Sequence, residues 1–374
     1  YKQSDLPDGV IDSIKMGDKR LIFLGLLGMI DPPREEAALS IAKCKDAGIE
    51  VKMATGDHKL TAAAIAREVG ILVGEEGVVT GEELEIWSDD KLDQEINGVS
   101  VFARVSPLHK YRIVESLNRQ GKIVAMTGDG VNDAPALKTA DIGIAMGING
   151  TDVTKETADM ILADDNFSTI VNAVEEGRLV FENITKVVKF LVTTNVGEIL
   201  ALMGALLFIP SAPIIVTPIQ ILWVNLVTDG LLTITLALEP IEESFMKQPP
   251  RQRNTPIIDK DITGLSSFVS LIMAAGVLWL YQGKLGVGSV LEAHNIAFVT
   301  LAMYQVFNAF NVRSKTESVL RRGFFTNKYL VASAVFSVLL TVLSTTTPLL
   351  QQLLGTIPLS NMDWVWVFGF SSLA

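Results

Sequence analysis

The chain contains a single cysteine among its 374 residues, Cys44, so an internal disulfide framework is excluded. This scarcity is typical of a domain that faces the reducing cytoplasm. No histidine and asparagine pattern accompanies Cys44, which favours a small core residue over a nucleophile. A clustered basic face is also lacking, and the formal net charge is −11. Because nucleic-acid phosphates bind clustered Lys and Arg, a nucleic-acid partner is excluded.

The sequence also lacks a signal-peptide pattern at Tyr1, and its first residues are typical of the middle of a domain. It stops inside an apolar run, 364–374, which is shorter than the roughly 20 residues of a membrane span. We therefore expect both ends to be truncations of a longer protein.

Hydrophobic residues make up 49% of the sequence, but they are unevenly distributed. The first half is typical of a soluble, charged α/β protein, whereas the second half alternates long apolar stretches with polar gaps. We expect the end of one soluble domain at 1–20, a second soluble domain at 21–166, and a stalk with membrane helices at 167–374.

Strand and helix patterns alternate in the soluble half, which predicts an α/β domain with a doubly wound parallel sheet. Ligands bind such sheets outside the carboxyl ends of the strands, where the Thr-Gly-Asp triplets at 55–57 and 127–129 fall. The segment 75–98 remains unassigned. The predicted strands are 21–30, 49–55, 100–105, 122–129 and 141–147, and the predicted helices are 35–48, 59–70, 107–121 and 134–140.

Six apolar segments in the second half predict an all-α, multi-pass domain in contact with membrane lipid. Their number and length disfavour the alternative, long buried helices of a soluble protein. Lys and Arg concentrate in the connections 239–261 and 313–328, whereas 210–216 and 348–360 carry none. The positive-inside rule then predicts a cytoplasmic soluble domain, and we expect the cell membrane as the location. The segments are about 183–209, 217–238, 262–281, 293–312, 329–347 and the cut 361–374.

The densest polar motif is Thr127-Gly-Asp-Gly-Val-Asn-Asp133. Its two carboxylates, Asp129 and Asp133, flank a tight glycine turn before a helix, and such a pair suits Mg²⁺ beside phosphate. The triplet at 55–57 offers a hydroxyl, backbone N–H groups and a further carboxylate. Lys110 offers the positive charge that phosphoryl transfer requires. Taken singly, a Gly-Asp-Gly is usually a turn and a surface lysine is usually only solvated.

In combination and order, these motifs resemble the phosphorylation domain of P-type ATPases, a member of the haloacid-dehalogenase-like superfamily. The matching text is DPPR (31–34), ATGD (54–57), FARVSPLHK (102–110) and MTGDGVNDAPALK (126–138). The resemblance implies that Asp129 binds the catalytic Mg²⁺ and that Asn132 and Asp133 order the phosphate. It implies that Lys110 contacts the transferring phosphoryl group. Nucleotide or phosphate contacts are implied for Asp31, Arg34, Thr55, Gly56, Asp57 and Arg104.

The nucleophile of that family is an aspartate in a DKTGT motif, which attacks the γ-phosphate of ATP, and this motif does not occur in the chain. The dephosphorylation loop and most of a nucleotide-binding domain are missing as well. We therefore expect the chain to be inactive alone and to work with a missing N-terminal part of the same pump.

Ionisable residues inside membrane spans are costly, so Glu198 and Asp229 are candidate functional residues. Helical spacing predicts that Asn195 shares a face with Glu198. It places Asn225 on the face of Asp229, with Thr228 beside them. Converging oxygen ligands suit a hard cation such as Ca²⁺. The alternative is polar contacts that only hold helices together, and two carboxylates without a nearby Lys or Arg disfavour it.

The text NVGE (195–198) and LWVNLVTDG (222–230) resembles the fifth and sixth membrane helices of calcium-transporting ATPases. The resemblance implies that Asn195, Glu198, Asn225, Thr228 and Asp229 are calcium ligands. In YQVFNAFN (304–311), Gln305 stands where two-calcium pumps have a ligating glutamate, so one site keeps an oxygen but loses a charge. We expect one ion per cycle, although one-ion pumps of the plasma-membrane type lack a counterpart of Glu198.

The sequence thus predicts an ATP-driven pump that moves Ca²⁺ out of the cytoplasm. A pump for Na⁺, Mn²⁺ or H⁺ is an alternative, because carboxylates and amides do not select one cation. Two alternatives of other classes are a membrane-anchored dehalogenase-like phosphatase and a truncated, non-catalytic partner subunit. One helix from about 167 to 209 would tie the Mg²⁺ pocket to Glu198, although its polar positions equally fit a solvated face.

Overall fold

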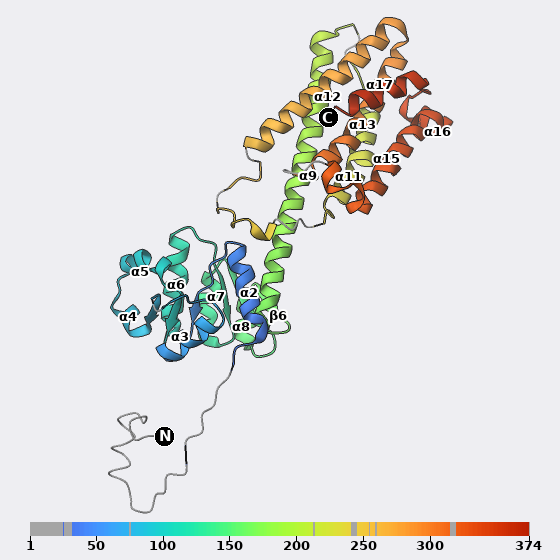
Figure 1. Cartoon of the computed structure of the whole chain (residues 1–374). Helices are drawn as coiled ribbons and strands as arrows, with labels where there is room; N and C mark the ends of the chain where they lie inside the picture. The colour runs from blue at the N-terminus through green and yellow to red at the C-terminus, as the bar shows by residue number, and fades with distance from the viewer. Residues whose placement is uncertain are drawn as a thin grey trace, which may run out of the picture.

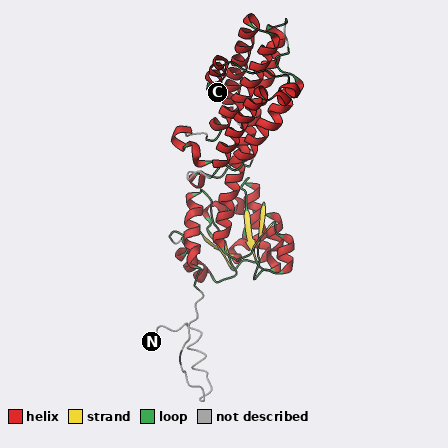
Figure 2. Cartoon of the chain, turned by 90° about the vertical axis from the view of Figure 1, so that its right-hand side faces the viewer, coloured by secondary structure: helices red, strands yellow, loops and turns green. Residues whose placement is uncertain are grey.

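The computed structural model describes residues 25, 32–74, 76–211, 214–240, 245–253, 255–258, 260–314 and 319–373. Two parts follow one another along the long axis of the molecule, and the helix α9 (Phe167–Phe208) runs from the first part into the second (Figure 1). The strands lie in the first part only, whereas the second part consists of helices (Figure 2). The predicted single helix across 167–209 is therefore confirmed.

The first part contains two three-stranded parallel sheets among the described residues, in the orders β1-β3-β2 and β4-β5-β6. The parallel α/β class predicted from the sequence is confirmed. Its strands are β1 Met53–Ala54, β2 Val78–Thr80, β3 Val101–Ala103, β4 Ala125–Gly128, β5 Ile142–Met146 and β6 Met160–Leu162. Its helices are α2 Glu35–Asp46, α3 Lys59–Glu68, α4 Gly81–Ile86, α5 Asp89–Glu95, α6 Pro107–Arg119, α7 Ala134–Thr139 and α8 Asp152–Thr157, with single turns η2 Ile96–Gly98 and η3 Val131–Asp133.

The segment 75–98, unassigned from the sequence, contains β2, α4 and α5. The strand β6 was also not predicted. Both strands have three residues, too few for an alternating pattern to stand out. Each strand forms by pairing with a strand elsewhere in the chain: β2 pairs with β3, and β6 pairs with β5. Of the predicted strand 21–30 only residue 25 is described, and Asp31 lies outside the described residues.

The second part contains five described helices that are long and apolar enough to cross a membrane: 167–208, 218–236, 263–287, 290–311 and 328–346. The predicted multi-pass membrane protein is thereby confirmed. The sixth predicted segment forms α17, which has 11 residues. The helical elements are α10 Pro218–Trp223, η4 Val224–Asp229, α11 Gly230–Leu236, η5 Phe245–Lys247, α12 Lys260–Val287, α13 Val290–Asn311, α14 Val319–Arg322, η6 Phe324–Thr326, α15 Lys328–Thr346, α16 Pro348–Leu354 and α17 Asn361–Ser371.

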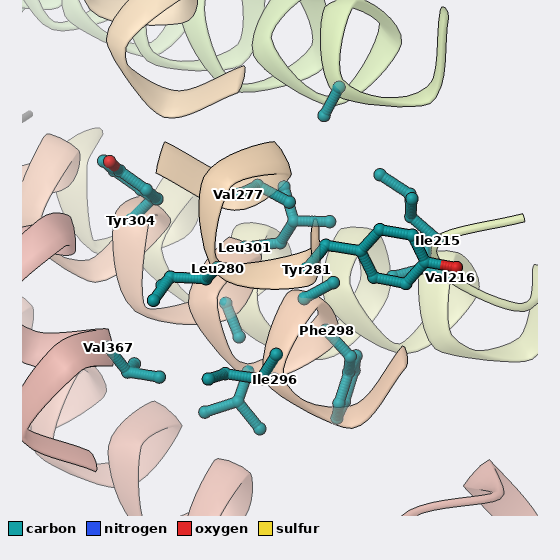
Figure 3. Packing of buried hydrophobic residues seen from close by; sticks show 14 of the residues in the cluster. Ile215, Val216, Val277, Leu280, Tyr281, Ile296, Phe298, Leu301, Tyr304 and Val367 are labelled. Atoms are coloured by element: carbon teal, nitrogen blue, oxygen red, sulfur yellow. The ribbon is translucent and has the colours of Figure 1, made fainter. Parts of the chain in front are cut away.

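Close packing of α9 on α12 is set by two glycines. A Cβ at Gly197 would lie 2.6 Å from the Met273 sulfur, and one at Gly204 would lie 2.5 Å from Leu278 Cδ1. Small residues at such contacts let membrane helices approach each other closely. Behind them, α13 is buried along most of its length, and its Phe298 and Leu301 belong to the largest apolar core (Figure 3).

The two parts are joined beside α9. The Arg178 guanidinium donates to the carbonyl oxygens of Ala47 at 2.8 Å, Phe245 at 2.8 Å and Gln248 at 2.9 Å. These acceptors belong to the end of α2 and to the connection between α11 and α12. One side chain of α9 therefore holds the α/β part and a membrane-proximal connection together.

Candidate functional site

A buried ion pair lies where the predicted phosphate pocket was expected. Lys110, in the first turn of α6, donates from Nζ to Asp133 Oδ1 at 2.6 Å. The Asp133 side chain is 6% exposed and that of Lys110 is 19% exposed. Gly128 makes room for this arrangement, because a Cβ there would lie 2.5 Å from the Asp133 Cβ. The structure thus brings together two of the predicted residues from the ends of β4 and β3.

Asp129 lies exposed at the end of β4, as does Asn132 in η3. The start of α8 holds the Asp129 backbone in place. The Asp129 carbonyl oxygen accepts from Thr151 N at 2.9 Å and from Thr154 Oγ1 at 3.2 Å. Its carboxylate accepts no hydrogen bond from the described residues. An exposed carboxylate on a fixed backbone, four residues before Asp133, fits Mg²⁺, which prefers one or two carboxylates and keeps several waters.

The Thr55-Gly56-Asp57 triplet forms a tight turn at the end of β1. Asp57 N donates to Thr55 Oγ1 at 3.1 Å, and Thr55 Oγ1 donates to Asp57 Oδ2 at 2.9 Å. The turn is held against the end of β3, since Arg104 N donates to the Asp57 carbonyl at 3.0 Å. Arg104 has a left-handed backbone (φ 50°) and an exposed side chain. Among the described residues, no hydrogen bond joins this triplet to Asp129 or Asp133.

Arg34 lies away from that triplet. Its Nη1 donates to the Asp165 carbonyl at 2.7 Å, beside the start of α9. Asp165 was missed from the sequence, and it holds the loop after β5 in place. Its carboxylate accepts from Ile148 N at 3.0 Å and from Asn149 N at 2.9 Å. These backbone hydrogen bonds, led by that of Ile148, lower the pKa of Asp165 below its usual value.

Inside the membrane part, Glu198 is the centre of a buried polar cluster. Gln305 Nε2 of α13 donates to Glu198 Oε1 at 2.9 Å. With its amide nitrogen turned toward Glu198, Asn225 lies 3.3 Å from both carboxylate oxygens. Side chains from α9, η4 and α13 therefore meet at one carboxylate.

Asp229 is 3% exposed and lies on η4, which is a π-helix rather than the α-helix that the spacing argument assumed. A π-segment is rare and often marks a functional site. Thr194 Oγ1 of α9 donates to Asp229 Oδ2 at 3.4 Å. Asp229 Oδ1 and Gln305 Oε1 are buried without a hydrogen-bond partner among the described residues, and Thr228 is buried beside Asp229.

The structure does not bring Asn195 into this cluster. Its side chain is exposed, and its Nδ2 donates to the Leu191 carbonyl of its own helix at 2.7 Å. The neighbouring Thr194 points into the cluster instead, where it donates to Asp229. Thr194 is therefore the polar residue that sequence reasoning missed here, and its spacing of four from Glu198 was the available signal.

The cluster fits a hard cation by its chemistry. Glu198 and Asp229 are buried carboxylates, and neither contacts a Lys or Arg among the described residues, whereas unpaired buried charge is costly. Unpartnered oxygens of Asp229 and Gln305 are the ligand type that Ca²⁺ takes. Among the described residues, no three or more His, Cys, Asp or Glu side chains are grouped so that they could hold a metal ion. The other oxygen atoms at Glu198 and Asp229 come from amide and hydroxyl groups.

Two family descriptions match the chain. Residues 10–141 match a haloacid dehalogenase-like hydrolase, and residues 213–374 match the C-terminus of cation-transporting ATPases. The chain is 44% identical to calcium-transporting ATPase 1 of Bacillus cereus over 98% of this chain and 43% of that protein. It is 42% identical to a calcium-transporting ATPase of Bacillus subtilis over 98% and 41%, and 38% identical to calcium-transporting ATPase 1 of Yarrowia lipolytica over 97% and 39%. The chain therefore spans about two fifths of the length of these curated relatives.

Proposed function

Since the chain belongs to the P-type family of cation-transporting ATPases, we propose that it serves a pump that moves Ca²⁺ out of the cytoplasm through an aspartyl-phosphate cycle. The observation that carries the proposal is the pair of buried carboxylates, Glu198 and Asp229, on helices that span the membrane part. They face amide and hydroxyl groups and no described cationic side chain. Buried carboxylates are costly inside a bilayer, and a helix that only anchors a phosphatase to the membrane does not require them.

In the α/β part, Asp129 is the residue that would hold Mg²⁺, which neutralises charge on the phosphates when bound. Lys110 would contact the transferring phosphoryl group, where negative charge develops. Asp133 orients the Lys110 ammonium through their 2.6 Å contact, and Asn132 lies exposed in the same turn. The nucleophilic aspartate is supplied by the N-terminal part of the pump. Its carboxylate oxygen forms a bond to the γ-phosphorus of ATP as the bond to ADP breaks, and water later hydrolyses the acyl phosphate.

The sheet arrangement supports that division. β1 and β4 are both edge strands, and each carries a Thr-Gly-Asp triplet at its carboxyl end. We place the strand that ends in the nucleophile between these two edges, which would set Thr55, Asp57 and Asp129 around one phosphate. Gly56 leaves the backbone of its turn open, since no atom lies within 4 Å of a Cβ built there. Arg104 would contact the nucleotide from the end of β3. Arg34 and Asp31 remain candidates for the hinge side.

In the membrane part, we propose Glu198, Asn225, Thr228, Asp229 and Gln305 as ligands of the transported ion, with Thr194 added. Asn195 reaches the site only if α9 rotates about its axis. Gln305 supplies an oxygen without a charge, which favours one Ca²⁺ per cycle. A pump for Na⁺ or Mn²⁺ has the same support from oxygen ligands. The domain limits at 20/21 and 166/167 belong to this proposal, with the α/β part in the cytoplasm and the spans in the cell membrane.

Phosphoenzyme formation from radiolabelled ATP tests the function. The chain is joined to the upstream region of its gene, expressed in membrane vesicles, and assayed with Mg²⁺ at stepped free Ca²⁺. We expect an acid-stable phosphoenzyme that requires Ca²⁺ and is lost when Glu198→Gln is introduced. Phosphoenzyme that forms with Na⁺ or Mn²⁺ but not with Ca²⁺ would overturn the calcium assignment. Hydrolysis of a generic phosphate ester without any phosphoenzyme would indicate a phosphatase instead.

The coding sequence upstream of Tyr1 separates the remaining alternative, a non-catalytic subunit. For a pump, this upstream region must encode DKTGT and a nucleotide domain in the same reading frame. A start codon directly before Tyr1 would exclude the pump as one polypeptide.

A further inference from the structure

A second buried charge cluster lies far from the ion site, where the helices leave the membrane part toward the α/β part. Glu239, three residues after the end of α11, is 1% exposed. Arg313 Nε donates to its Oε1 at 3.0 Å, and the Arg313 Nη2 forms an ion pair with the same oxygen at 2.9 Å. Arg322 Nε also donates to this oxygen at 3.0 Å. Asn327 Nδ2 donates to Glu239 Oε2 at 2.7 Å. Both carboxylate oxygens are therefore used.

The cluster also includes the backbone around Glu239. Asn183 of α9 donates from Nδ2 to the Glu239 carbonyl at 2.9 Å and to the Ala237 carbonyl at 3.1 Å. Arg313 Nη1 donates to the Gly323 carbonyl at 3.1 Å. We call Asn183, Glu239, Arg313, Arg322 and Asn327 the Glu239 cluster. It joins α9, the end of α11, the end of α13, and the start of α15.

These are the helices that carry the candidate ion ligands. Asn183 and Glu198 share α9, Asp229 precedes Glu239 on the η4–α11 segment, and Gln305 precedes Arg313 at the end of α13. Buried charges that are paired and hydrogen-bonded have one favourable arrangement, because removing a partner leaves an uncompensated charge. Because the Glu239 cluster contacts all three helices, it opposes their sliding past one another along their axes.

We propose that the Glu239 cluster is a positioning device for cation binding: it holds α9, α11 and α13 in the register that brings Glu198, Asp229 and Gln305 together. Glu239 touches neither ion nor nucleotide and acts through the helices it joins. The inference rests on the proposed function, because its consequence is a change in cation affinity. Neutralising Glu239 removes the charge to which Arg313 and Arg322 both donate, so the tie between the helix ends weakens and the ligands lose their common geometry.

The test uses the full-length pump in membrane vesicles and compares Glu239→Gln with Asp363→Asn. Asp363 pairs with Lys284 at 2.7 Å and joins α17 to α12, neither of which carries a proposed ligand. This variant therefore removes an ion pair between two other helices. We expect Glu239→Gln to raise the Ca²⁺ concentration for half-maximal phosphoenzyme at least tenfold, with the maximal level kept at saturating Ca²⁺. Asp363→Asn should stay within twofold of the wild type.

Asn183→Ala keeps the proposal testable if Glu239→Gln fails to fold, because it removes the tie to α9 and leaves every charge paired. We expect it to raise the same Ca²⁺ requirement at least threefold. No shift in Asn183→Ala, or an equal shift in Asp363→Asn, overturns the positioning role. Wild-type vesicles that form no Ca²⁺-dependent phosphoenzyme would instead refute the proposed function.

Discussion

The Lys110–Asp133 pair allows a quantitative prediction, because its two partners differ in access to water. Lys110→Met leaves the Asp133 carboxylate, 6% exposed, without its cation. Breaking a buried pair in this way costs about 3–5 kcal/mol, and partial exposure of Lys110 reduces this to about 2–3 kcal/mol. Asp133→Asn leaves an ammonium that is 19% exposed and free to turn toward water, so we expect a smaller loss of about 1–2 kcal/mol.

Hydrogen–deuterium exchange of the segment 128–140 measures these losses locally, since global two-state unfolding does not hold for a chain of two parts. The two single variants and the double variant form a thermodynamic cycle. We expect a coupling free energy of about 1.5 kcal/mol, which corresponds to about tenfold in the local opening constant. A coupling below about 0.5 kcal/mol, or a larger loss for Asp133→Asn than for Lys110→Met, would refute the reasoning from burial.

Three further predictions concern other contacts. Gly128→Ala should displace Asp133 and destabilise the β4–α7 region by about 1–3 kcal/mol. Gly98→Ala is the control, because its Cβ meets no atom within 4 Å, and it should not destabilise its own region. Local hydrogen exchange measures both effects. Backbone hydrogen bonds lower the pKa of Asp165, so its stabilisation is present above its unfolded pKa of about 3.9 and is lost as pH falls through the lower folded value. Asp165→Asn should abolish this acid-dependent part of the protection from hydrogen exchange in the segment 147–166. An unchanged pH profile of this protection would contradict the prediction. Gln305→Glu places a second carboxylate against Glu198, so it should lower the melting temperature in a Ca²⁺ chelator. The rise in melting temperature on adding Ca²⁺ should then be larger in the variant than in the wild type. Equal rises in the two proteins would argue against a shared ion site.

The soluble motifs could be predicted because their chemistry follows strand ends. Both Thr-Gly-Asp triplets fall where β1 and β4 end, and Lys110 lies in the first turn of α6, the helix that follows β3. Local sequence suffices for such positions, since a strand, a turn and a helix start are each set by neighbouring residues. The contact between Lys110 and Asp133 required the fold, because 23 residues separate them.

The membrane site was predictable in its carboxylates but not in its geometry. Glu198 and Asp229 stand out because charge in a span is expensive. Thr194 points into the site and Asn195 away from it, because the side of α9 that carries Glu198 at a spacing of four also carries Thr194. The burial of Glu239 arises from contacts between distant segments, which spacing along one helix does not encode. The spacing also gave no sign of the π-helix at 224–229.

The length of α9 sets an angular tolerance for the ion site. Fifteen residues separate Asn183 from Glu198, which is about 22 Å at 1.5 Å per residue. With Asn183 as a fulcrum, a tilt of only about 5° sweeps Glu198 sideways by about 2 Å, nearly a whole Ca²⁺–oxygen bond length of about 2.4 Å. A small swing of the α/β part is thus magnified into the loss of a ligand. The displacement of Glu198 for a given tilt of α9 is therefore set by the distance between Glu198 and the point at Asn183 where the helix is held.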